Sequence, residues 1–253
     1  MKNFWKKMKR VLKLMFFASA AVLFFILLGS AVKNQNDTIC KKVTITIDHQ
    51  HGNFFVDEMR VRNHIEIAAQ DSIEGKMLSE IPFKKISEVV KQDPYVKDVE
   101  VFSNIKGEVH IHVKQKLPFI RIINKNGVSY YLDQYGSRIP LSDNFTANVV
   151  VANGNIEEND SLMQKNLFDF AKFIREENFW NAQIEQIYVN DQKEFDLIPR
   201  IGDQVIQFGT AEKMEKKFSD LFIFYTEGLS HTGWDQYKTI TLKYDGQIVC
   251  TKK

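Results

Sequence analysis

The feature that most constrains this chain is a long uncharged segment close to its first residue. Residues 14–32 (LMFFASAAVLFFILLGSAV) carry no charged side chain. At a rise of ~1.5 Å per residue, such a segment forms a helix of roughly 28 Å, about the thickness of the hydrocarbon core of a bilayer. The sequence therefore predicts a transmembrane helix over 14–32.

The charges before this segment predict its orientation. Six basic residues and no acidic residue precede Leu14: Lys2, Lys6, Lys7, Lys9, Arg10 and Lys13. Basic residues stay on the cytoplasmic side, so we expect a cytoplasmic tail over 1–13 and a large domain in the periplasm, the single-pass type II topology of the inner membrane. A cleaved signal peptide is the alternative, which the small residues 29–31 permit. The apolar run is longer than the ~7–15 residues usual for such signals, and no clean A-x-A site follows it.

The remaining charge argues against a nucleic-acid partner. Removing the six N-terminal basic residues from the total of 34 leaves 28 basic against 32 acidic residues, a formal charge of −4. Nucleic-acid binding draws its affinity from lysine and arginine on phosphates, which an acidic domain supplies poorly. About 220 residues after the apolar segment suffice for two small domains.

The first of these domains is predicted over 39–115, after a polar stem at 33–38. The expected order is a strand at 43–47, a helix capped by Asp57, a helix beginning near Pro82, a strand at 99–101 and a strand at 109–113. Period-2 alternation marks the strands, and apolar residues at helical spacing mark the helices. One sheet with two helices on one face is the economical packing, an α+β layer.

A strand-rich second domain with two flanking helices is predicted over 116–253. Its strands are expected at 119–123, 128–132, 149–151, 184–189, 194–198, 205–208, 239–244 and 247–250, and its helices at 161–177 and 211–227. The Asp245-Gly246 pair between the last two strands is a strong hairpin signal. The segment 239–244 is also expected to be an edge strand with unpaired backbone groups.

Motifs that carry catalysis or bind cofactors do not occur in this chain. His110 and His112 lie on the same side of a predicted strand and His49 and His51 share a loop, but a zinc site needs three or four ligands and no third is suggested. We therefore expect no catalytic residue, no cofactor and no metal. Cys40 and Cys250 are interpreted as unpaired apolar residues, although an oxidising compartment would permit a bond between them.

Several stretches, in their order and spacing, resemble the FtsQ/DivIB family of bacterial cell division proteins. They are 94–101 (PYVKDVEV), 109–118 (VHIHVKQKLP), 132–140 (LDQYGSRIP), 205–209 (VIQFG) and 240–246 (ITLKYDG). The resemblance implies that 39–115 is a POTRA domain and 116–253 an FtsQ-type β domain. Gln115 departs from the pattern, because the family usually has glutamate there.

The resemblance also implies a function without catalysis. FtsQ-like proteins are scaffolds that recruit the division proteins FtsB and FtsL, and through them septal peptidoglycan synthesis. In the family the partner adds a strand near the last strand of the β domain, a mode in which main-chain hydrogen bonds give affinity. Carried onto this sequence, the expected partner-binding residues are Thr239, Ile240, Lys243, Tyr244, Asp245 and Gly246.

Two other classes of protein remain as alternatives. A POTRA-bearing envelope protein that assists outer-membrane protein assembly or secretion usually carries several POTRA modules or a transmembrane barrel, and the sequence shows one module and no set of membrane-spanning strands. A periplasmic hydrolase on an anchor would need a nucleophile and base that the sequence does not suggest.

Overall fold

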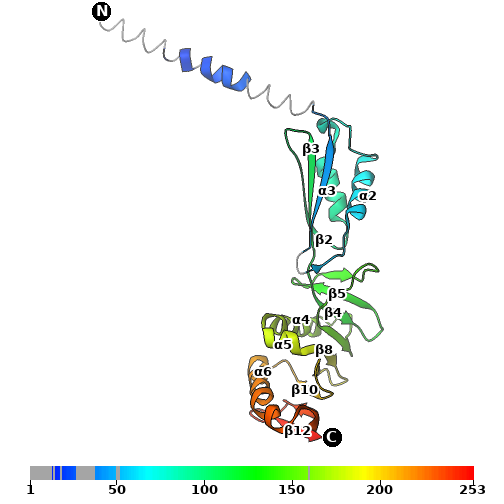
Figure 1. Cartoon of the computed structure of the whole chain (residues 1–253), viewed down its shortest axis with the longest axis vertical. Coiled ribbons are helices and arrows are strands. Elements are labelled where there is room, and N and C mark those ends of the chain that lie inside the picture. Colours follow the sequence, from blue (N-terminus) through cyan, green and yellow to red (C-terminus); the bar gives the residue numbers. More distant parts are fainter. Residues whose placement is uncertain (1–12, 14, 18, 27–37, 50–51, 159) are drawn as a thin grey trace, which may run out of the picture. The chain divides into compact units, whose positions relative to one another are not determined.

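The computed structural model describes residues 13, 15–17, 19–26, 38–49, 52–158 and 160–253 (Figure 1). The chain divides into two compact units. The first comprises Met1–His49 with Val56–Gln115, and the second comprises Gln50–Phe55 with Lys116–Lys253. Each unit is described by itself.

The predicted membrane span falls only partly within the described residues. Residues 15–17 and 19–26 are helical and exposed. No helix in the described part of the chain is long and apolar enough to cross a membrane. The rest of the predicted span, almost all of the predicted cytoplasmic tail (1–12) and most of the predicted stem (33–37) lie outside the described residues.

The first unit has the predicted strand-helix-helix-strand-strand order. Its elements are β1 (Lys42–Asp48), α2 (Glu58–Ala69), the 3-10 turn η2 (Leu78–Glu80), α3 (Phe83–Lys91), β2 (Val96–Ser103) and β3 (Glu108–Gln115). The strand order is β1-β3-β2, with β1 parallel and β2 antiparallel to the central β3. Alternate residues of β3, Val109, Ile111 and Val113, are buried, which gives the sheet one core face.

Local side-chain hydrogen bonds fix the ends of these elements. Asp57 caps α2 as predicted, because its carboxylate accepts from the backbone N–H of Arg60 at 2.7 Å. At the end of β3, the buried Gln115 amide accepts from the Val56 N–H at 2.9 Å and donates to the Asp48 carbonyl at 3.0 Å. A glutamate carboxylate accepts but does not donate, so glutamine satisfies both backbone groups at once.

One buried carboxylate joins the two helices of this unit. Asp93 follows α3, and its side chain is fully buried. It is bonded to the Arg60 guanidinium and to His64 Nε2 (3.0 Å) from α2, and it accepts from the Tyr95 N–H at 3.0 Å. Arg60 also lies over the Tyr95 ring. Both partners reach solvent, so the Arg60 guanidinium neutralises the buried acid without being fully buried itself.

The second unit is built on one nine-stranded sheet. The strands are β4 (Pro118–Ile123), β5 (Ser129–Asp133), β6 (Arg138–Pro140), β7 (Val151–Gly154), β8 (Ile184–Val189), β9 (Phe195–Pro199), β10 (Val205–Gly209), β11 (Tyr237–Thr241) and β12 (Val249–Lys252). Their order across the sheet is β12-β11-β10-β9-β8-β7-β4-β5-β6. The sheet therefore ends in β6 on one side and in β12 on the other.

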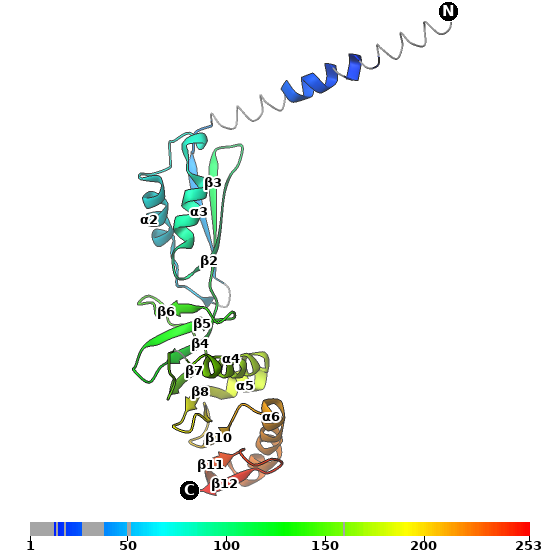
Figure 2. The ribbon, with the colours of Figure 1, turned by 180° about the vertical axis from the view of Figure 1, so that it is seen from behind.

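Helices cover one face of this sheet. They are α4 (Ser161–Glu176), α5 (Asn178–Gln183), α6 (Met214–Ile223), the π-helical turn η3 (Phe224–Leu229) and the short α7 (Ser230–Thr232), followed by η4 (Trp234–Gln236). Both views show α4, α5 and α6 on the same side of the strands (Figures 1 and 2). Aromatic rings fill the layer between them, with Phe170, Phe208 and Phe218 in mutual contact and Trp180 against Phe218.

Several predicted elements differ at their ends, among them one helix and two strands of the second unit. The helix expected over 211–227 starts at Met214, because Lys213 has left-handed backbone angles, and widens into η3 from Phe224. The strand expected at 149–151 occupies Val151–Gly154, since a turn bonds the Val149 N–H to the Ala147 carbonyl. The strand expected at 239–244 runs from Tyr237 to Thr241.

The Asp93 network yields a prediction for stability. Asp93→Asn leaves Arg60 and His64 without their carboxylate and should lower the free energy of unfolding of the first unit by about 3 kcal/mol. This is the lower end for a broken buried pair, because both partner side chains remain in contact with water. Hydrogen exchange resolved by peptide measures this for each unit separately. The control is Asp71→Asn, a solvated acid whose loss should cost less than about 1 kcal/mol. Equal protection in the two variants would contradict the prediction.

Candidate partner-binding surface

The edge of the large sheet lies one strand further along the chain than predicted. β11 is paired on both sides, parallel to β10 and antiparallel to β12. The expectation that 239–244 forms an edge strand is therefore wrong, and the edge on this side is β12. The predicted hairpin was a signal for this position of the edge. When the first strand of a hairpin already pairs with another strand on its other side, the second strand must form the edge.

The six residues predicted for partner binding fall into two groups. Ile240 is a core residue of β11 with no exposed surface, and Thr239 is half-buried on the same strand. Lys243, Tyr244, Asp245 and Gly246 are exposed in the loop 242–248 between β11 and β12. Tyr244 is 59% exposed and does not belong to the core. The structure thus places four of the six on one loop beside the edge strand.

The loop begins as an extension of the sheet. The N–H of the buried Leu242 donates to the Gln207 carbonyl at 2.9 Å, which prolongs the pairing of β10 with β11 by one residue. Thr241 Oγ1 donates to Gln207 Oε1 at 2.8 Å on the same strand pair. The Asp245-Gly246 pair forms the centre of a turn in which the Gln247 N–H reaches the Tyr244 carbonyl. The predicted turn is present, within a connection longer than two residues.

Ion pairs hold this loop to the start of α6. Asp245 accepts from Lys213 Nζ at 2.7 Å and from Lys216 Nζ at 2.6 Å. These two hydrogen bonds, with the charge of the lysines, lower the pKa of Asp245 to about 2. All three side chains are largely in water, so the pairs order the loop rather than contribute much to global stability.

A second ion pair ties the loop to the neighbouring strands. Lys243 Nζ is bonded to Glu194, just before β9, and this bond lowers the pKa of that carboxyl. Lys217 lies close by and donates to the carbonyls of Phe208 (3.0 Å) and Thr210 (2.9 Å), while burial lowers its pKa. The loop and α6 together line a small cavity of about 140 Å³ with a lysine-rich rim.

β12 itself has a surface suited to pairing with another strand. Val249 is 45% exposed, Thr251 and Lys252 are exposed, and Cys250 is half-buried. An edge strand presents a row of backbone N–H and C=O groups on its outer side. The loop that leads into β12 carries the exposed Tyr244, and tyrosine is enriched among the anchors of protein interfaces. The arrangement offers a backbone template and a side-chain anchor within one short stretch of chain.

The residues considered for metal binding or disulfide formation are placed elsewhere. His110 and His112 are half-buried on β3, each with its ring against Phe102. His51 lies outside the described residues. Among the residues that the structure places, no group of three His, Cys, Asp or Glu is arranged to hold a metal ion. Cys40 and Cys250 are free thiols, and burial raises the pKa of both.

Comparisons with protein families agree with this architecture. Residues 117–251 match the family model described as FtsQ/DivIB, C-terminal related, and residues 38–114 match the model described as POTRA-like domain. The first match covers more than half of the chain. No curated protein matches the sequence.

The matches and the fold together place this chain among α+β scaffold proteins that have a POTRA-like module and a strand-rich C-terminal domain. The chain belongs to the FtsQ/DivIB family. It is thus a cell division protein, from a family of non-enzymatic scaffolds that act through protein–protein contacts in the divisome.

The ion pairs of Asp245 with Lys213 and Lys216 yield a prediction for pH dependence. Because the folded-state pKa of Asp245 lies below its ordinary value, its ion pairs are intact above that ordinary value and are lost as pH falls through about 2. The double variant Lys213→Met with Lys216→Met should raise this pKa toward its ordinary value, and high salt should act in the same direction because the pairs are exposed. An NMR titration that follows the Asp245 carboxyl carbon measures this pKa in the variant and in the unmodified chain.

The control for this titration is Lys84→Met, which removes an exposed lysine of the first unit. It should leave the pKa of Asp245 unchanged. A double variant that titrates like the unmodified chain would show that the two lysines do not hold the loop.

Proposed function

We propose that this protein is a membrane-anchored divisome scaffold that recruits FtsB- and FtsL-type partners and links them to septal peptidoglycan synthesis. The observation that carries the proposal is the edge strand β12, which lies in the domain matched to the FtsQ/DivIB family and beside the exposed loop 242–248. The family match favours this function over outer-membrane protein assembly or secretion.

The partner is proposed to bind by adding a strand to β12. Strand addition draws its affinity from main-chain hydrogen bonds, so the template must have a free edge, as β12 has in the sheet order of the described residues. Val249 and Tyr244 would supply side-chain contacts, since both are exposed apolar or aromatic residues next to this edge. Lys243 and Asp245, already paired within the domain, would fix the loop rather than meet partner charges.

The anchor and its topology complete the proposal. Residues 14–32 are proposed to span the inner membrane with 1–13 in the cytoplasm, followed by a stem at 33–38, a POTRA domain at 39–115 and an FtsQ-type β domain at 116–253 in the periplasm. The support is the uncharged stretch and the six basic residues before it. The site of action would be the division septum, where a scaffold of this family meets its partners.

Strand addition is tested by substitutions at the edge. Val249→Lys should abolish co-purification of an FtsB-type partner, because a lysine on an edge strand opposes strand pairing. Tyr244→Ala should do the same by removing the proposed anchor. Both side chains are exposed, so the domain should stay folded, which circular dichroism verifies.

The matched control is Val128→Lys. This valine is 50% exposed in the same domain but lies just before β5, away from β12 in the sheet order. It should bind the partner as the unmodified chain does. If Val249→Lys also retained the partner, strand addition at β12 would be wrong.

The anchor is tested by charge. The double variant Leu23→Arg with Phe24→Arg places two charges within the predicted span. Each arginine at the centre of a membrane helix raises the free energy of insertion by about 2.5–3.5 kcal/mol. The double variant should therefore leave the membrane fraction, and a periplasm-competent fluorescent fusion should lose the midcell band expected of the unmodified protein. A uniform peripheral signal from the unmodified fusion would contradict action at the septum.

A further inference from the structure

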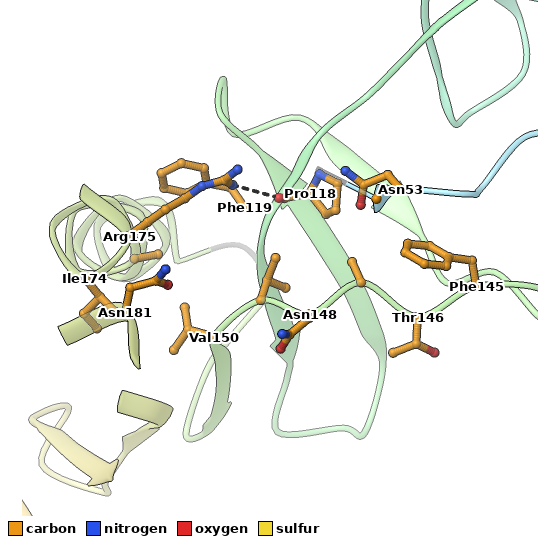
Figure 3. Close-up of a pocket in the computed structure, with 14 residues that line it drawn as sticks. Asn53, Pro118, Phe119, Phe145, Thr146, Asn148, Val150, Ile174, Arg175 and Asn181 are labelled. Atoms are coloured by element: carbon orange, nitrogen blue, oxygen red, sulfur yellow. Dashed lines mark hydrogen bonds between the residues drawn. The ribbon is translucent and has the colours of Figure 1, made fainter. Parts of the chain in front are cut away.

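A larger cavity lies in the second unit, at a distance along the sheet from β12. It has a volume of about 510 Å³, within the range of about 300–1,000 Å³ usual for ligand sites. Figure 3 shows its walls: the start of β4, the segment 145–150 before β7, and the ends of α4 and α5. In the sheet order, β4 and β7 are four or more strands away from β12, so this cavity is separate from the proposed partner edge.

Among the described residues of the lining, Arg175 in the last turn of α4 is the single charged one. Its Nη1 donates to the Pro118 carbonyl at 3.1 Å, and the guanidinium lies 5.0 Å from the centre of the Phe119 ring (Figure 3). A guanidinium has five N–H donors, so most of this group's donor capacity is left for a ligand. Arg175 is half-buried, and this burial lowers its pKa.

No acid in the described lining neutralises this cation. The lining contains neither Asp nor Glu, and the neighbouring Glu176 and Glu177 line a different cavity. The other polar side chains in the described lining are neutral, namely those of Asn53, Thr146, Asn148 and Asn181. Figure 3 shows Asn181 on the helical side beside Arg175, and Asn148 on the segment opposite. A half-buried cation among amides and aromatic rings favours an anionic ligand.

We propose that this cavity binds the C-terminal carboxylate of a peptide. The guanidinium matches a carboxylate in two parallel hydrogen bonds, the asparagine amides match peptide N–H and C=O groups, and Phe119, Phe145 and Ile174 provide apolar surface for the terminal side chain. A doubly charged phosphate fits less well, because one cation faces it and the carbonyl end of α4 carries partial negative charge.

The test uses methyl NMR on the full-length chain, with Ile174 as reporter, because this isoleucine lines the cavity. The probe is acetyl-Ala-Ala-Ala with a free carboxylate, titrated to millimolar concentration. It should shift the Ile174 methyl signal and leave Ile86 of the first unit unchanged. The same peptide as a C-terminal amide, and acetate alone, should each bind at least about tenfold more weakly, since one lacks the charge and the other lacks the peptide groups.

Two variants test the same assignment from the protein's side. Asn148→Asp introduces a negative charge at an exposed lining position without removing a core contact, and should weaken the probe about tenfold or more. Arg175→Lys keeps the charge but loses the paired donors, and should weaken it as well. Asn144→Asp is the matched control, an exposed asparagine outside the lining, and should bind the probe normally.

Several results would overturn the proposal. They are no shift of Ile174 at millimolar probe, equal binding of the amide peptide, equal binding of acetate, or an Asn148→Asp variant that binds like the control. Each variant's fold is checked from its unperturbed Ile86 and Ile120 methyl signals, so a loss of binding is not mistaken for unfolding. Loss of the partner at β12 would leave this result unaffected, because the two sites share no residue.

Discussion

The parallel pairing of β10 with β11 is the interaction on which the partner-binding surface depends. It aligns Ile206 with Ile240, both without exposed surface, and the Leu242 N–H extends it to the Gln207 carbonyl. A parallel pair needs a crossover, and α6 with η3 supplies it while burying Phe218, Leu221 and Tyr225 against the same sheet. This pairing sets β11 inside the sheet, and β12 follows by a hairpin. The free edge is thus a consequence of where the crossover returns the chain.

The same crossover explains why the loop 242–248 is held in place. Because α6 follows β10 after a short turn, Lys213 just before the helix and Lys216 in its first turn lie within reach of Asp245 once β11 has paired. An ordered loop loses less conformational entropy when a partner binds than a mobile one does. The surface charges therefore contribute little to folding, but they fix the position of Tyr244 beside β12. Electrostatics here acts on the shape of a binding surface rather than on global stability.

Local patterns predicted the elements well, and non-local pairing set the limits of prediction. Asp57 as a helix cap, the strands β8, β9 and β10 and the hairpin around Asp245-Gly246 each depend on a few neighbouring residues, and all were predicted. The edge was misplaced because alternation in 239–244 does not say how many strands lie beside it. Ile240 was assigned to binding for the same reason, although β11 is paired along both edges and Ile240 itself is buried. The cavity around Arg175 was not predicted, since its walls come from segments near residues 53, 118, 148 and 175.

Gln115 shows how one residue can depart from a family pattern without changing the fold. The amide bridges Val56 and Asp48, two backbone groups of opposite hydrogen-bonding sense that a carboxylate would not satisfy together. The neutral side chain also removes the cost of burying a charge at a position that is 5% exposed. Glutamine in place of the family's usual glutamate is therefore compatible with the same backbone arrangement at the end of β3. Gln115 thus changes the local hydrogen bonding at the end of β3 and does not argue for a different family.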